Sequence, residues 1–153
     1  MLTSKLFKLK TVELKELEKI YKQNYKWGLF YKQCILSSKK PYVKDLYKKL
    51  VCQKISFHKL IIKEMLKRVD QEYLQKLDRE CKNELRELQQ KYHPDLNNKH
   101  SLMCCNIEKN LYSAYCESLR KITDGKIRAL ILNQKYQIKL LREEMVKIEK
   151  YLI

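Results

Sequence analysis

The chain contains very few residues that interrupt helices. Its 153 residues include only 2 Gly and 2 Pro, whereas a fold with many strands needs such residues at its turns. Lys, Leu, Glu, Gln and Arg dominate the composition, and all of them favour helices. We therefore expect an all-α protein, either one compact domain or a small domain with helical extensions.

Recognisable catalytic and metal-binding patterns are also missing. The six cysteines include no C-x-x-C pair, and the adjacent Cys104 and Cys105 are poorly arranged to ligate one tetrahedral ion. No Ser/His/Asp constellation, glycine-rich phosphate loop or carboxylate pair in an apolar setting is recognisable. We predict that the protein is not an enzyme and uses no metal or cofactor. Its cysteines are predicted to be reduced thiols, several of them in the core.

Long apolar runs are absent as well. None reaches the roughly 20 residues that a membrane-spanning helix needs, and none has the form of a secretory signal. We therefore expect no transmembrane segment and an intracellular location, in the cytoplasm or in a mitochondrion-type organelle.

Acidic residues are scarce in the first half of the chain. Residues 1–69 hold 18 Lys+Arg and only 5 Asp+Glu, which accounts for +13 of the total net charge of +16. This asymmetry fits RNA, an acidic membrane surface or an acidic protein as a partner, and it equally fits a compositional bias toward Lys, Tyr, Asn and Ile. An RNA- or ribosome-associated protein would use the aromatic residues among these lysines to stack on bases, namely Trp27, Tyr21, Tyr25 and Tyr31.

Apolar residues at three- and four-residue spacing predict a series of helices. In the first half, the predicted helices are residues 12–27, ended or bent by Gly28, a short helix around 43–50, and a helix capped by Ser56 that reaches Val69 or Tyr73. In the second half, one helix is capped by Asp78 and stopped by Pro94, the next is 102–122, capped by Ser101, and the last runs from 126 to near the end. The last helix carries a heptad seam with Gln134 as its polar interruption. That seam predicts a long amphipathic helix packed against residues 12–55, and a coiled coil with a partner is the alternative.

The most informative segment follows the helix that Asp78 is predicted to cap. Residues 88–95 read Leu-Gln-Gln-Lys-Tyr-His-Pro-Asp. An amphipathic helix with apolar residues at 81, 85, 88 and 92 thus ends in His93-Pro94-Asp95, and a polar loop leads into the next helix. Three residues alone are a weak signal, so their context decides the interpretation.

This context resembles the J-domain family, named after DnaJ. In that family a helix with an apolar stripe ends in Tyr-His-Pro-Asp, and the helix after the loop carries an Ala-Tyr pair, matched here by Ala114-Tyr115. The resemblance covers roughly residues 60–122 and is best over 78–119. It implies an antiparallel helix pair within residues 56–122, flanked by a basic helical extension (1–55) and a long C-terminal helix (123–153). The residues expected to hold the pair together are Leu85, Leu88, Tyr92, Leu111 and Tyr115.

The resemblance implies a co-chaperone that stimulates ATP hydrolysis by a DnaK-type heat-shock chaperone. Asp95 would offer a carboxylate to an arginine of the ATPase, His93 would position the turn and Pro94 would stiffen it. A basic helix face would steer the acidic surface of the ATPase, through Lys82, Arg86 and Lys91. The plainer alternative is an ordinary helix stop beside a solvated face interrupted by Glu84 and Glu87.

One branch of the family is more similar than the others. The chain resembles HscB-like J-proteins, which serve iron–sulfur cluster assembly, at Leu77-Asp78, Leu88-Gln89 and the Arg-Ala pair at 128–129. This resemblance implies an iron–sulfur scaffold protein as client. The chain departs from the family in having no Gly in the expected first helix and Leu96 where a basic residue is usual. The alternative function is therefore a basic RNA- or ribosome-associated protein with a degenerate J-like fold.

Overall fold

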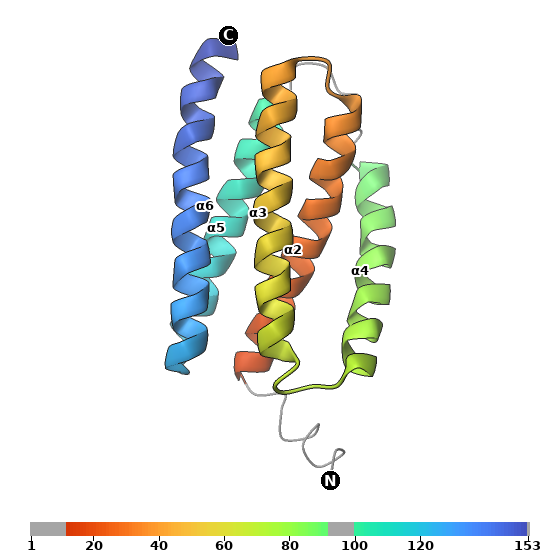
Figure 1. The fold of residues 1–153 in the computed structure, drawn as a ribbon, viewed down its shortest axis with the longest axis vertical. Helices are drawn as coiled ribbons and strands as arrows, with labels where there is room; N and C mark the ends of the chain where they lie inside the picture. The colour runs from red at the N-terminus through yellow and green to blue at the C-terminus, as the bar shows by residue number, and fades with distance from the viewer. Residues whose placement is uncertain (1–11, 92–99, 153) are drawn as a thin grey trace.

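The computed structural model describes residues 12–91 and 100–152, and every regular element in these ranges is a helix (Figure 1). The helices are α2 (Val12–Ser37), α3 (Pro41–Met65), α4 (Gln71–Lys91), α5 (His100–Lys121) and α6 (Gly125–Leu152). The predicted all-α fold is confirmed.

Four of the helices form a bundle, and α4 is added to its outside. α2 packs against α3, α3 against α6, α6 against α5, and α5 against α2, which closes a ring around a common core. α4 packs chiefly against α2 and lies at the edge of the molecule (Figure 1). Successive helices run in opposite directions, as in an up-and-down bundle. The end of α4 and the start of α5 therefore lie at the same end of the bundle.

The central position of α2 explains why α4 and α5 do not form the expected pair. The neighbours Ile20 and Tyr21 are both buried, as are Phe30 and Tyr31, which requires that a helix be covered on more than one side. α3, α4 and α5 supply this cover. The prediction that α4 and α5 hold each other directly is thus wrong in this respect: they run antiparallel, but α4 packs chiefly on α2, and α5 packs on α6 and α2.

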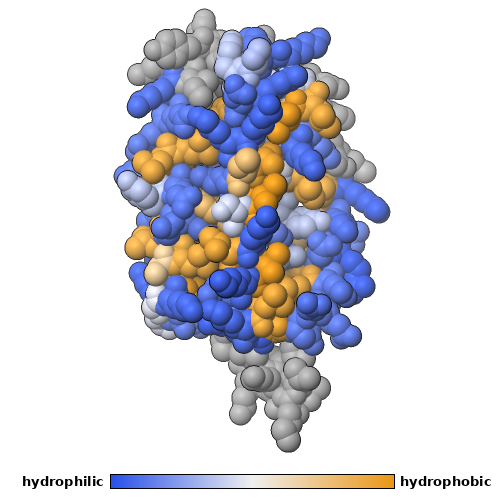
Figure 2. Space-filling view, in the orientation of Figure 1, coloured by the Kyte–Doolittle hydropathy of each residue, from blue (hydrophilic) through white to orange (hydrophobic). Residues whose placement is uncertain are grey.

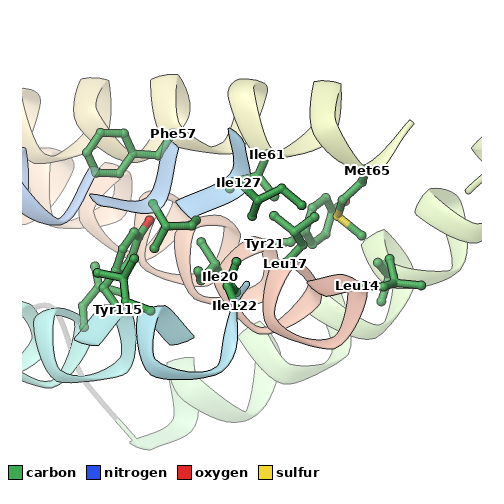
Figure 3. Packing of buried hydrophobic residues seen from close by; sticks show 14 of the residues in the cluster. Leu14, Leu17, Ile20, Tyr21, Phe57, Ile61, Met65, Tyr115, Ile122 and Ile127 are labelled. Carbon is green, nitrogen blue, oxygen red and sulfur yellow. The ribbon is translucent and has the colours of Figure 1, made fainter. Parts of the chain in front are cut away.

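The core consists of two apolar clusters, one toward each end of the bundle. The first unites the N-terminal half of α2 with the C-terminal halves of α3 and α5, the start of α6 and two residues of α4 (Figure 3). The second unites the opposite ends of α2, α3, α5 and α6. The buried seam of α6 supplies residues to both clusters, so this helix packs within its own chain. Its main neighbour is α5, with α3 second, whereas residues 12–55 were predicted to cover it.

Three helix boundaries differ from the prediction. α2 continues through Gly28 to Ser37, because Gly28 is a site of close helix contact and not a stop. α3 is one helix of 25 residues with Pro41 in its first turn, so Ser56 is an exposed residue inside a helix and not a cap. α4 begins seven residues before Asp78, because Asp70 accepts the hydrogen bond of the Tyr73 backbone N–H. The predicted domain boundary between residues 55 and 56 consequently falls inside α3.

Gly28 sets the spacing between α2 and α3. A Cβ at this position would lie 3.3 Å from the Cβ of Lys54, which is closer than such atoms normally approach. We expect Gly28→Val to lower the free energy of unfolding by about 1–3 kcal/mol, the usual cost of overpacking, in urea titrations followed by circular dichroism. Gly125→Ala is the control, since a Cβ there meets nothing within 4 Å. An equal loss in both variants would contradict the close-contact explanation.

Candidate functional site

Three glutamates in the second half of α4 lie on one side of the helix, and two of them pair with α2. The carboxylates of Glu80 and Glu84 lie 3.2 and 3.9 Å from Lys22 Nζ of α2. Glu87 follows Glu84 by three residues and belongs to the same side of the helix. These three glutamates therefore do not interrupt the opposite side of α4, where Asp78 and Glu72 are the acidic residues.

That opposite side carries three exposed cations, which we call the basic stripe: Arg79, Lys82 and Arg86. Their spacing of three and four residues places them in one row along the helix. Lys82 Nζ lies 3.1 Å from the carboxylate of Asp78, whereas Arg79 and Arg86 form no ion pair with any other described residue. Exposed charges of this kind contribute little to stability but attract an oppositely charged partner.

The predicted chaperone-binding residues are only partly within the described structure. Lys82 and Arg86 are brought together on the basic stripe, and Arg79, which the sequence analysis missed, extends it by one turn. Lys91 is the last residue of α4, and the position of its side chain is outside the description. His93, Pro94 and Asp95 lie outside the described residues, in the segment 92–99 that joins α4 to α5.

α4 is anchored through a few apolar side chains. Leu77 and Cys81 are buried and belong to the first core cluster, together with Leu111 and Tyr115 of α5. Leu85 is only half-buried. A cavity of about 290 Å³ is lined by residues of α2, α4 and α5, among them Glu84, Ala114 and Tyr115. The Ala-Tyr pair of the J-domain resemblance thus borders an open space between α5 and α4.

His58 on α3 contributes to the region where α4 meets α2. Its ring lies 4.4 Å from that of Tyr21 and 5.5 Å from that of Tyr25, measured between centroids. Nδ1 is buried and has no hydrogen-bond partner among the described residues. Burial lowers the pKa of His58, and this effect outweighs the opposing influence of Asp78 and of the Tyr21 backbone. No local pattern indicates a buried histidine at this position, because a histidine among lysines resembles a surface residue.

We expect His58 to make the protein less stable in mild acid. Its pKa is lower in the folded chain than the ordinary value of 6.5, so below that pH the unfolded chain binds a proton that the folded chain resists, and folding stability falls. The denaturation midpoint should therefore drop between about pH 7.5 and about pH 5.5, a range in which His is the side chain that normally titrates. His58→Gln should show a smaller drop, and an unchanged drop would assign the effect to other groups.

A buried ion pair lies between the two apolar clusters. Lys54 Nζ on α3 lies 2.6 Å from Glu108 Oε1 on α5, and both side chains are 0% exposed. The hydroxyl of Tyr31 on α2 donates to the other carboxylate oxygen at 2.7 Å. Burial lowers the pKa of Lys54, while Glu108 acts against that shift. The carboxylate thus has two hydrogen-bond donors, which a buried charge requires.

A second buried polar group connects α2, α5 and α6. Asn24 Nδ2 donates to the hydroxyl oxygen of Tyr115 at 2.8 Å, and that hydroxyl donates to Gln134 Oε1 at 2.7 Å. Gln134 Nε2 reaches the carbonyl oxygen of Phe57 on α3 at 3.4 Å. The polar interruption of the α6 seam is therefore matched by partners inside the bundle.

The aromatic residues expected to stack on RNA bases are mostly core residues. Trp27 is 9% exposed, Tyr21 is 3% and Tyr31 is 0%, while Tyr25 is half-buried. Because base stacking needs an accessible ring face, this part of the RNA hypothesis is wrong. Three lysines of the same helix, Lys15, Lys19 and Lys32, are exposed, so part of its charge remains available.

The cysteines divide into core and surface thiols. Cys34, Cys81 and Cys104 are buried, in line with the expectation that several cysteines serve as core residues. Burial raises the pKa of Cys34 to about 11 and that of Cys81 to about 12, so these thiols are poor nucleophiles. Across residues 12–91 and 100–152, no group of three or more potential ligands is placed to hold a metal ion, and no described helix is both long and apolar enough to cross a membrane.

Comparisons with protein-family models, with curated proteins and with solved structures each gave no match for this chain.

Proposed function

We propose that the protein is a co-chaperone that stimulates ATP hydrolysis by a DnaK-type heat-shock chaperone, with α4 and the His-Pro-Asp segment as its docking surface. The observation that carries the proposal is the distribution of charge on α4: Glu80 and Glu84 lie toward Lys22 of α2, and the basic stripe lies on another side of the helix. His93-Pro94-Asp95 follows this helix directly in the sequence.

The basic stripe and Asp95 have different roles, which follow from the chemistry of their charged groups. The basic stripe attracts the acidic surface of the ATPase over a distance and raises the rate of encounter. Asp95 then accepts a charge-assisted hydrogen bond from an arginine of the ATPase, which is stronger than a neutral one. The co-chaperone performs no chemistry itself. By resemblance to the HscB-like branch, the client is an iron–sulfur scaffold protein.

Single-turnover ATP hydrolysis by a DnaK-type chaperone tests the proposal. The native protein should accelerate hydrolysis, and Asp95→Asn should abolish the acceleration at every concentration. The double variant Lys82→Glu/Arg86→Glu should instead require about tenfold more co-chaperone for the half-maximal effect, the size expected when electrostatic steering is lost, with the maximal rate retained.

Lys109→Glu/Lys139→Glu is the matched control, since both lysines are exposed and lie on α5 and α6. It changes the net charge by the same amount and should leave the half-maximal concentration unchanged. If the native protein fails to accelerate hydrolysis with several chaperones of the same source, the co-chaperone proposal is rejected.

A further inference from the structure

The exposed side of α3 is rich in lysine. Lys48, Lys59 and Lys63 are exposed and Lys44 is half-buried, and their spacing puts all four on the side of the helix that faces away from the core. At 1.5 Å per residue, the row from Lys44 to Lys63 is about 28 Å long. Asp45 is the acidic residue at its start, and the next acidic residue along α3 is Glu64.

The row ends in a group of like charges contributed by two helices. Lys67, just after α3, and Lys126, in the first turn of α6, are close enough to perturb each other, and Lys63 also acts on Lys126. The neighbouring lysines lower the pKa of Lys126. Glu64 balances part of this charge by pairing with Lys67 at 2.9 Å, and Asp124 lies 3.8 Å from Arg68.

We propose that this lysine surface binds the phosphate backbone of nucleic acid. The lysine surface comprises Lys44, Lys48, Lys59, Lys63, Lys67 and Lys126. Lys48, Lys59 and Lys63 form no ion pair with any described residue, so their charges are free for a ligand. α3 runs along the front of the view in Figure 1, and the same face in Figure 2 carries hydrophilic side chains beside apolar ones.

The shape of the charge favours nucleic acid over other anions. A row of about 28 Å matches an extended polymer with regularly repeated charges better than it matches a single anionic group. A basic helix that binds a lipid surface inserts a continuous apolar face. The continuous apolar face of α3 is buried in both core clusters, and the apolar residues exposed on this helix, such as Ile55 and Leu60, are scattered. The surface lies on a different helix from the basic stripe, so it is independent of the proposed chaperone docking.

RNA binding tests the inference. Fluorescence anisotropy measures the binding constant for a single-stranded RNA of about 16 nucleotides and for its duplex, at salt concentrations from about 50 to about 200 mM. Lys48→Gln/Lys59→Gln/Lys63→Gln should weaken binding at least about tenfold at low salt. For the single strand, the slope of log K against log salt concentration should also become less steep by about 2, because each of the three lost phosphate contacts contributes about 0.7 to that slope.

The control Lys109→Gln/Lys121→Gln/Lys139→Gln removes the same charge from exposed positions on α5 and α6 and should bind RNA like the native chain. If both triple variants bound RNA equally more weakly, the net charge alone would explain the effect, and the proposal would be overturned. The absence of RNA binding at low salt, or tighter binding to phosphatidylserine vesicles than to either RNA, would overturn it as well.

Discussion

Lys54→Met should destabilise the protein by about 3–5 kcal/mol, the usual effect of removing one partner of a buried ion pair. Methionine nearly fills the space of the lysine chain, so the loss comes from charge and not from a cavity. Glu108, which is 0% exposed, would keep the Tyr31 hydroxyl as a donor but lose its cation. Urea unfolding followed by circular dichroism measures the difference.

A second substitution separates the charge effect from other causes. In Lys54→Met/Glu108→Gln the unpaired carboxylate is replaced by a neutral amide that can still accept from Tyr31. The double variant should therefore be clearly more stable than Lys54→Met alone. If it is less stable, the lysine acts through packing, for example through its position 5.9 Å from the Phe57 ring centroid, and not by neutralising Glu108.

Tyr115→Ala should have an effect of similar size. Tyr115 is fully buried, and its ring lies 6.4 Å from that of Phe57, measured between centroids. Removing a large core side chain costs about 3–5 kcal/mol, and the hydroxyl also holds Asn24 and Gln134. Tyr115→Phe keeps the ring and should lose about 1–3 kcal/mol, the cost of leaving buried polar partners unsatisfied.

The difference in free energy of unfolding between these two variants separates the contribution of the Tyr115 ring from that of its hydroxyl. Equal losses in Tyr115→Phe and Tyr115→Ala would mean that the ring itself contributes nothing. That result would contradict its place in the first core cluster.

The sequence predicted well those elements whose signals are local. α6 begins and runs as expected, because Asp124 accepts hydrogen bonds from the backbone N–H groups of Lys126 and Ile127 and the apolar seam is regular. α5 was predicted to begin at Leu102 and extend to Ile122, and its observed bounds are His100–Lys121. The all-α class followed from the scarcity of Gly and Pro.

The features that sequence reasoning missed depend on contacts between distant segments. Lys54 is buried only because Glu108, on another helix, meets it. Gly28 was predicted to end or bend a helix. Its actual role, to let α2 approach Lys54 of α3 closely, can be seen only when the two helices are packed together. The basic stripe was predicted in part, at Lys82 and Arg86, but nothing local indicated that Glu84 lies beside Lys22.

The position of α4 at the edge of the bundle has a further consequence. A helix that packs chiefly against one neighbour can detach and unfold locally at a lower free energy than the ring of four helices. A partner that binds only the folded form of α4 would have to supply that ordering free energy, and its binding would slow amide hydrogen exchange in α4 more than in α2, α3, α5 or α6. The binding strength of this surface is therefore coupled to the local stability of one peripheral helix.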